Sequence, residues 1–408
     1  MSDTTKKRII FVDDEPNILS GLRRMLHAFH QDWDMTFVES AREALRLLEN
    51  SRYDIIITDI RMPEMNGVEL LIEVRRLYPH MVRIALSGHS EEEMILKSVG
   101  PSHQFLAKPC SAETLKSIIR RSSDLREILS DDGLKKTISE IQTLPSLPNL
   151  YLEIVDELKS PSSTMKKVGN IIAKDIGMTS KIIQLVNSAY FGLRRPVSNP
   201  EHAATVLGID TIKSLTLSLH VFNSIEEGQF EFLDAKKLWD HSSLTSIIAK
   251  ELVKCEQGAS DQADDAFIAG MLHDIGLLIL VLNMPEKYKE VISLVNSEKI
   301  SLISAEKRLL NATHAEVGAY LLGIWGLPDA ILEAVYYHHE PDKSPTSGFS
   351  PVTAVYIANL LDGDNRFLSC PEQAMTPDME YLSHIGRKPR WEAWKAVHRE
   401  IISRKKHE

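Results

Sequence analysis

Near the N-terminus lies the stretch Arg8-Ile9-Ile10-Phe11-Val12-Asp13-Asp14, a short apolar run that ends in two carboxylates. Its apolar residues follow one another without alternation, which is typical of a strand buried on both faces. A second stretch, Asp54-Ile55-Ile56-Ile57-Thr58-Asp59, repeats this form and also ends in a carboxylate. Segments with apolar residues at helical spacing separate the runs. The pattern predicts a parallel sheet covered by helices on both faces.

Three further apolar runs, at residues 35–38, 82–86 and 104–107, complete this pattern. Five strand–helix units in residues 6–122 predict an α/β doubly wound domain with a five-stranded parallel sheet.

Four of the predicted strands end in polar residues: Asp13 with Asp14, then Asp59, Ser87 and Lys108. The carboxyl ends of parallel strands share one edge of a sheet, and ligands bind there. Clustered carboxylates repel one another unless a cation lies among them, and a set of oxygen ligands suits Mg²⁺. A carboxylate beside Mg²⁺ can attack a phosphoryl donor, while a lysine neutralises the developing charge.

Together with Met62-Pro63, Asn66-Gly67, Ser87-Gly88 and Lys108-Pro109, these residues resemble the receiver domain of two-component response regulators. The resemblance covers residues 6–122. It implies that a sensor histidine kinase phosphorylates Asp59.

The same resemblance assigns roles to the residues around Asp59. Asp14, Asp59 and the backbone carbonyl of Arg61 would hold Mg²⁺, with Asp13 acting through water. Ser87 and Lys108 would contact the phosphoryl group. Phe105 would be the aromatic residue that changes position when Ser87 engages the phosphoryl group.

From Ser111 onward the apolar spacing is helical. We expect a helical linker at residues 123–143, either a solvated connector or a helix that carries the signal or dimerises. Residues 144–340 predict an all-α domain, and residues 341–408 a C-terminal helical extension of it. Near the end, an apolar stripe of Trp391, Trp394, Val397 and Ile401 lies in a basic helix that we expect to pack on its own domain rather than on a membrane.

Histidines recur in the helical domain with one adjacent carboxylate: His241, His273-Asp274, His314 and His338-His339. Imidazoles and a carboxylate from separate helices can bind Mn²⁺, Fe²⁺ or Zn²⁺. A metal held in this way can generate hydroxide for attack on a phosphodiester. A lone histidine more often belongs to a core. The order of the whole set, however, resembles the HD superfamily of metal-dependent phosphohydrolases, and in particular its HD-GYP branch, which cleaves cyclic di-GMP.

A closer resemblance is carried by Leu144-Pro145-Ser146-Leu147-Pro148 and Val186-Asn187-Ser188-Ala189-Tyr190, followed by Ala203-Ala204 and Leu207-Gly208. These motifs resemble the HDOD domain, a relative of the HD enzymes that has mostly lost catalysis and serves in signalling. The resemblance implies an output that acts by contact with a downstream protein or with a second copy of the chain.

Three departures oppose the enzyme alternative, a receiver-regulated phosphohydrolase acting on a cyclic dinucleotide. Leu277 stands where HD-GYP enzymes carry a lysine. No Gly-Tyr-Pro follows His338-His339. Asn359 stands in place of a late aspartate ligand, and Asp362 lies one turn after it.

Composition limits the partners and the cellular location that we expect for this chain. A net charge of −10 argues against a nucleic-acid partner, which normally needs a basic face. Three distant cysteines, Cys110, Cys255 and Cys370, fit reduced thiols in a cytoplasm. The apolar run at residues 275–282 is too short to span a bilayer, and charges near the N-terminus oppose a secretory signal. We expect a cytoplasmic protein without a transmembrane segment.

Overall fold

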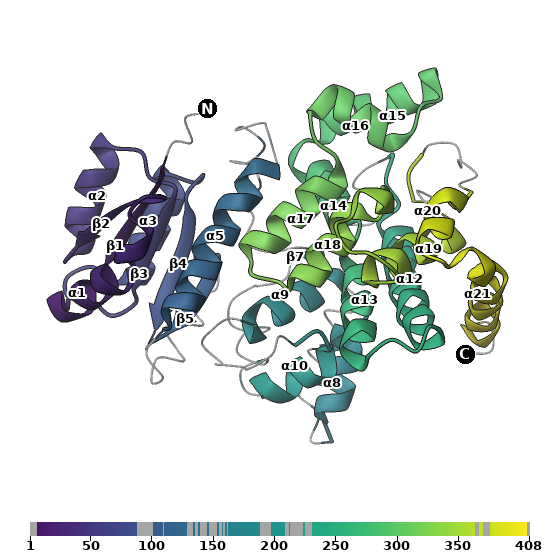
Figure 1. Ribbon diagram of the computed structural model, residues 1–408, viewed down its shortest axis with the longest axis horizontal. Coiled ribbons are helices and arrows are strands. Elements are labelled where there is room, and N and C mark those ends of the chain that lie inside the picture. Colours follow the sequence, from purple (N-terminus) through teal and green to yellow (C-terminus); the bar gives the residue numbers. More distant parts are fainter. Residues whose placement is uncertain are drawn as a thin grey trace.

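The computed structural model describes residues 6–87, 101–108, 110–128, 162–187, 197–208, 231–363, 367–369 and 376–405, together with isolated positions between 134 and 224. The N-terminal part is an α/β unit and the remainder is helical (Figure 1).

The N-terminal unit contains one five-stranded parallel sheet in the order β2-β1-β3-β4-β5. The doubly wound fold expected from the apolar runs is confirmed. Its strands are β1 (Lys7–Val12), β2 (Trp33–Val38), β3 (Ile55–Asp59), β4 (Val82–Ser87) and β5 (Gln104–Ala107). Its helices are α1 (Pro16–Met25), the 3₁₀ turn η1 (His27–Phe29), α2 (Ala41–Asn50), α3 (Gly67–Leu77) and α5 (Ala112–Ile128).

Local sequence explains where these helices begin. Pro16 occupies the first turn of α1, where its missing N–H leaves no bond unmade. The Ser40 side chain caps α2 by accepting a hydrogen bond from the Glu43 N–H. Asn66 and Glu69 form a reciprocal capping box at the start of α3.

The α5 helix continues past the predicted end of the first domain. It runs to Ile128, so the first residues of the helical linker predicted at 123–143 are helical. Leu115 and Ile119 on α5 are fully buried. Within residues 129–143 the structure describes only Leu134 and Ile138, and both are buried.

The all-α character of the second unit is confirmed. A minor addition is a parallel pair of two-residue strands, β6 (Pro145–Ser146) and β7 (Asn223–Ser224). The helices are α8 (Met165–Ile172), α9 (Ile176–Val186), α10 (Pro200–Leu207), α12 (Ala235–Cys255), α13 (Ser260–Leu272), α14 (Ile275–Asn283), α15 (Pro285–Glu298), α16 (Leu302–Leu310), α17 (His314–Ile324) and α18 (Asp329–Tyr337).

The C-terminal extension adds two 3₁₀ turns and three helices: η3 (Pro341–Lys343), α19 (Pro351–Asp362), α20 (Met379–His384), η4 (Lys388–Arg390) and α21 (Trp391–Lys405). Trp394 on α21 is fully buried, and its indole N–H donates to Glu256 Oε1 at 3.0 Å. Arg390 donates to the same carboxylate oxygen at 2.5 Å. The basic helix therefore packs on its own domain, as expected.

Helices α13 and α14 form an apolar stretch, Ser260–Asn283, that is long enough to cross a membrane by length and composition alone. Its most apolar window is 83% buried inside the protein, so the stretch belongs to the core.

Candidate phosphoacceptor site and histidine cluster

The carboxyl edge of the sheet gathers the three predicted acidic residues. Asp13 follows β1, and Asp59 is the last residue of β3. One carboxylate oxygen from each of Asp13, Asp14 and Asp59 lies within 4.8 Å of the others. Asp13 and Asp59 are buried. Three carboxylates this close suit a divalent cation bound by oxygen ligands.

Lys108 joins this acidic cluster from the residue after β5. Its Nζ lies 2.6 Å from Asp13 Oδ2 and 2.6 Å from Asp59 Oδ1. Burial would lower the pKa of this ammonium group, but hydrogen bonding to Asp13 and Asp59 and their negative charge raise it above its ordinary value. Lys108 is therefore a permanent cation at the Asp59 carboxylate.

Gly67 explains how α3 can begin directly against the end of β3. A Cβ atom at this position would lie 1.9 Å from the Asp59 carbonyl oxygen. The Gly67 N–H donates to Ile60 O at 2.9 Å. Only glycine fits here, so the predicted Asn66-Gly67 motif fixes the loop that carries Asp59.

Of the remaining predicted receiver residues, Ser87 and Phe105 are described only by their backbones. Ser87 ends β4 and pairs with Ala107, and Phe105 pairs with Ala85. The side chains of Ser87 and Phe105, together with Gly88 and Pro109, lie outside the described residues. Arg61 is exposed on the loop after β3.

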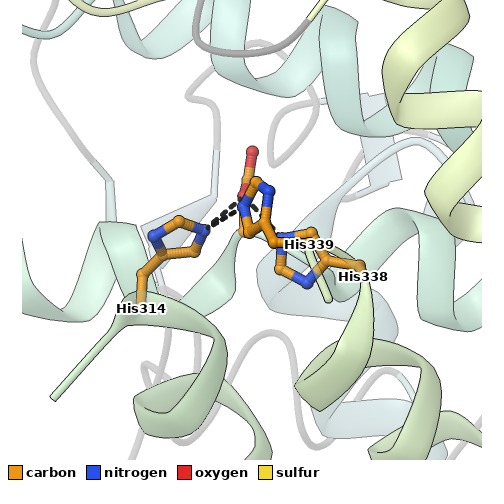
Figure 2. A group of neighbouring side chains, drawn as sticks. His314, His338 and His339 are labelled. Carbon is orange, nitrogen blue, oxygen red and sulfur yellow. Dashed lines mark hydrogen bonds and ion pairs between the residues drawn. The ribbon is translucent and has the colours of Figure 1, made fainter. Parts of the chain in front are cut away.

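In the helical unit, five elements bring the six predicted ligands together. His241 lies on α12, and His273 and Asp274 form the junction between α13 and α14. His314 is the first residue of α17, and His338 and His339 follow α18. Figure 2 shows His314 directed toward the His338–His339 pair from a different helix, with His314 Nε2 2.9 Å from His339 Nε2.

Asp274 lies at the centre of this histidine cluster. Its Oδ2 is 3.2 Å from His273 Nε2 and 3.8 Å from His241 Nε2. Its Oδ1 is 3.4 Å from His314 Nε2 and 3.7 Å from His338 Nε2. The cluster thus divides into two groups that share Asp274: one with His241 and His273, and one with His314, His338 and His339.

Acceptors behind the imidazoles determine which nitrogen faces Asp274. His314 Nδ1 lies 2.9 Å from Glu306 Oε2, and His241 Nδ1 lies 2.7 Å from Asp362 Oδ2. Backbone carbonyls, Gly270 O at 2.8 Å and Val335 O at 2.6 Å, occupy Nδ1 of His273 and His338. An acceptor at Nδ1 leaves Nε2 as the available ligand atom, as in most protein metal sites.

Burial and charge strongly perturb the cluster. Burial would raise the pKa of Asp274, but the positive charge of His273 and His314 holds it well below its ordinary value. Burial would lower the pKa of His314, but Glu306 and Asp274 hold it well above its ordinary value. Burial and the neighbouring histidines lower the pKa values of His338 and His339. His338 and His339 are thus neutral, which is the form that binds metals, whereas His314 carries a proton that a bound metal would have to displace.

The buried polar atoms of the cluster provide a test of whether a metal fits. Within the described part of the chain, Nε2 of His338 has no hydrogen-bond partner, and the Asp274 oxygens have only the imidazole nitrogens of the cluster at 3.2–3.8 Å around them. His241 Nε2 and His273 Nε2 are 3.2 Å apart, close to the ~3.4 Å between two nitrogens on one tetrahedral Zn²⁺. The donor set and its spacing therefore fit a transition metal.

Two carboxylates beside the cluster have positions that no sequence motif indicates. Glu306 is fully buried and lies eight residues before His314, and the turn between α16 and α17 brings it into contact with the His314 ring. Asp362 lies one turn after Asn359, the residue that stands in place of the late aspartate ligand. It contacts His241 Nδ1, on the side away from Asp274.

The two residues that depart from the HD-GYP pattern, Leu277 and Asn359, both lie in helices of the second unit. Leu277 is fully buried on α14 and belongs to the hydrophobic core. Asn359 is buried on α19, and its Oδ1 has no hydrogen-bond partner among the described residues.

Among curated proteins, the chain is 25% identical over 242 residues to an uncharacterized protein of Treponema pallidum (strain Nichols), covering 58% of this chain and 46% of that protein. It is 34% identical over 133 residues to the hydrogenase transcriptional regulatory protein HoxA of Cupriavidus necator, covering 32% of this chain and 27% of that protein. The chain thus spans less than half the length of either relative.

Two solved structures are similar to parts of the chain. The MmoQ response regulator from Methylococcus capsulatus str. Bath is 23% identical with a TM-score of 0.47, covering 60% of this chain and 93% of that one. An HDOD domain protein of unknown function from Geobacter sulfurreducens is 22% identical with a TM-score of 0.39, covering 71% of this chain and 95% of that one.

Family models match both parts of the chain. The response regulator receiver domain matches residues 9–120, and the HDOD domain matches residues 144–341. The two matches fall on the α/β unit with its acidic cluster and on the helical unit with its histidine cluster. The chain is therefore a response regulator that joins an N-terminal receiver domain to an HDOD output domain.

Proposed function

We propose that this response regulator works in a cytoplasmic phosphorelay. A sensor histidine kinase phosphorylates Asp59, and the HDOD domain passes the signal on by contact with a downstream protein or with a second copy of the chain. The receiver and HDOD matches support this assignment.

The position of Lys108 carries the proposal. Its Nζ contacts the Asp59 and Asp13 carboxylates equally, at 2.6 Å each. When an Asp59 oxygen attacks phosphorus, a new O–P bond forms, the bond from phosphorus to the donor atom of the kinase breaks and its electron pair leaves with the donor, and negative charge develops on the transferred oxygens. A fixed ammonium group beside that oxygen stabilises the charge without reorganising. Mg²⁺, held by Asp14, Asp59 and the Arg61 carbonyl with Asp13 acting through water, would neutralise the phosphoryl oxygens.

The test is phosphorylation of the full chain by acetyl phosphate with Mg²⁺, followed by intact mass. Asp59→Asn should abolish the added phosphoryl mass, because an amide cannot form the acyl phosphate. Asp34→Asn, at an exposed aspartate of the same domain, should retain it. Phosphorylation that persists in Asp59→Asn would overturn the assignment.

The histidine cluster supports a second candidate function, metal-dependent hydrolysis of a cyclic dinucleotide. His241, His273 and Asp274 would hold one metal ion, and Asp274, His314, His338 and His339 another. Bound Mn²⁺, Fe²⁺ or Zn²⁺ would supply Lewis acidity and a nucleophilic water. Asp362 and Glu306 would keep His241 and His314 turned toward Asp274.

Burial weighs against this second candidate. Asp274, His241, His273, His314 and His338 are all buried. Catalytic metal sites keep a position open to substrate, whereas structural sites are closed. The arrangement thus favours a metal that stabilises the output domain over one that turns over a substrate.

Two measurements separate these possibilities. Metal content after loading with Mn²⁺ or Zn²⁺ should fall in His273→Ala/Asp274→Ala and remain in His202→Ala, which changes an exposed histidine. Cyclic di-GMP hydrolysis is then measured with and without phosphodonor. Turnover lost in the double variant would make the protein a phosphohydrolase; bound metal without turnover would make the ion structural.

A further inference from the structure

A pocket lies at the outer edge of the receiver sheet, beside strand β2. This strand ends the sheet on the side opposite β5, away from the HDOD helices (Figure 1). The start of β1, the end of α1, the η1 turn and β2 all contribute to its lining. Its volume is about 670 Å³, which lies within the range of roughly 300–1,000 Å³ found for small-molecule sites.

Positive charge dominates this edge pocket. Its charged lining residues are Lys6, Arg8, Arg23 and Asp34. Arg8 Nε lies 3.1 Å from Asp34 Oδ2, so this ion pair cancels one charge of each sign. Lys6 and Arg23 then give the pocket a net charge of +2, on a chain whose total charge is −10. A hollow lined by one sign of charge concentrates ligands of the opposite sign.

The surrounding elements hold these two cations in place. Lys6 Nζ donates to the His30 carbonyl at 3.0 Å, which ties the start of β1 to the loop before β2. The guanidinium carbon of Arg23 lies 5.0 Å from the centre of the Phe37 ring. Phe37 is itself stacked on Phe11, with the ring centres 4.8 Å apart. Among the described residues, no hydrogen bond uses the N–H groups of Arg23, so they are available to an anion.

The pocket also has an apolar surface. Met35 and Phe37 line it and are two residues apart on β2, so their side chains share one face of the sheet. Arg23 lies on this same face, over the Phe37 ring. A planar guanidinium group can stack on a nucleobase and can also bind phosphate oxygens through its N–H groups. The lining therefore suits a ligand that joins a phosphate to a flat ring.

The edge pocket is distinct from the acidic cluster and from the histidine cluster. Arg8 lies near the start of β1, and Asp13 follows the end of that strand. About 17 Å of extended chain separates the two residues. The HDOD helices lie beyond β5, at the other end of the sheet (Figure 1).

We propose that this edge pocket binds a nucleoside monophosphate. The phosphate contacts Lys6 and Arg23, and the base lies against the apolar surface of Met35 and Phe37. A phosphate monoester carries a charge of about −2 at neutral pH, which matches the net charge of the pocket. Inorganic phosphate alone would leave the apolar surface uncovered, and an acidic peptide carries only single charges spread along its backbone.

The test is isothermal titration calorimetry of the full chain with AMP and with GMP, in low salt and EDTA. EDTA prevents a metal at either cluster from binding the phosphate. Lys6→Gln/Arg23→Gln should raise the dissociation constant at least about tenfold, because two charge-assisted hydrogen bonds are lost. Arg24→Gln, at the neighbouring arginine outside the pocket, should bind like the unaltered chain. All three residues are exposed, so the variants should keep the fold.

Further titrations identify which part of the ligand is recognised. Adenosine and inorganic phosphate should each bind at least about tenfold more weakly than AMP, because each lacks one half of the ligand. Failure of both nucleotides to bind would refute the site, as would an unchanged affinity in Lys6→Gln/Arg23→Gln. An equal loss in Arg24→Gln would mean that general surface charge attracts the nucleotide. Tighter binding of inorganic phosphate or of a hexaglutamate peptide than of AMP would refute the nucleotide as the ligand.

Discussion

At Asp274, the two oxygens of one carboxylate face different pairs of imidazoles, and carboxylates or backbone carbonyls hold the outer nitrogens of those rings. Such outer contacts typically set ligand affinity as much as the ligands themselves do. Glu306 makes the most extensive of these outer contacts. It accepts hydrogen bonds from both the ring and the backbone N–H of His314 and also from the Tyr288 hydroxyl, the last at 2.7 Å.

Glu306→Gln should weaken metal binding at the cluster by about 10–100-fold, because the neutral amide no longer orients and polarises His314. Competition titration with a Zn²⁺ or Mn²⁺ indicator measures the affinity. Glu290→Gln, at an exposed glutamate, is the matched control. Equal affinities in the two variants would show that Glu306 has no influence on the site.

Lys181 is a buried cation on α9, with its Nζ 5.1 Å from the centre of the Trp325 ring. Burial lowers the pKa of its ammonium group from 10.5 to about 7. Between these two pH values the unfolded chain binds more protons than the folded one. The free energy of unfolding should therefore rise with pH above 7, by up to about 1.4 kcal/mol per pH unit.

Lys181→Met should remove this rise and should stabilise the protein most below pH 7, where the buried charge is complete. Urea denaturation at a series of pH values gives the measurement. Lys174→Met, at an exposed lysine, should keep the slope of the unaltered chain. A slope that survives in Lys181→Met would assign the pH dependence to another group.

At the scale of elements, close backbone contacts determine where both candidate sites lie. Gly67 lets α3 begin against Asp59, and Gly276 lets α14 lie against the first turn of α17. Neither contact leaves room for a methyl group, and in each case the obstructing atom belongs to the backbone. Glycine at these two positions therefore allows the close backbone packing that places Asp59 and His314 in the two candidate sites.

Gly276→Ala should destabilise the HDOD domain by at least about 1–3 kcal/mol, because the new Cβ overlaps the His314 carbonyl. Chemical denaturation measures the loss. Gly21→Ala on α1 has no atom within 4 Å of the new Cβ and should instead stabilise the chain by about 0.5–1 kcal/mol. A neutral Gly276→Ala would mean that α14 and α17 can separate without cost.

At the scale of the whole molecule, the C-terminal extension completes the HDOD domain. Glu256, just past α12, accepts from Trp394 and forms ion pairs with Arg387 and Arg390. Through these bonds, α21 holds the end of the helix that carries His241. The receiver takes no part in these particular bonds.

Trp394→Ala should lower HDOD stability by about 3–5 kcal/mol while leaving phosphorylation of Asp59 unchanged. Trp391→Ala should cost much less, since that ring is only partly buried. Thermal unfolding and intact mass after acetyl phosphate supply the two measurements. Loss of phosphorylation in Trp394→Ala would show that the domains fold as one unit.

The sequence by itself determined the receiver fold and its acidic edge. Short runs of β-branched residues such as Ile55-Ile56-Ile57, bounded by polar residues, indicate strands buried on both faces, and parallel strands bring Asp13, Asp59 and Lys108 to one edge. The helical unit and the set of histidines were also evident, because motif order in the chain is enough to indicate them.

Only the tertiary structure decided what surrounds those residues. Glu306 and Asp362 stand behind different histidines, and Gln104 contacts Ile324 across 220 positions of sequence. Periodicity reports which face of a helix is apolar, not which distant helix meets it. Contacts of this kind depend on how whole helices pack, and helix packing is a property of the assembled core rather than of any local pattern.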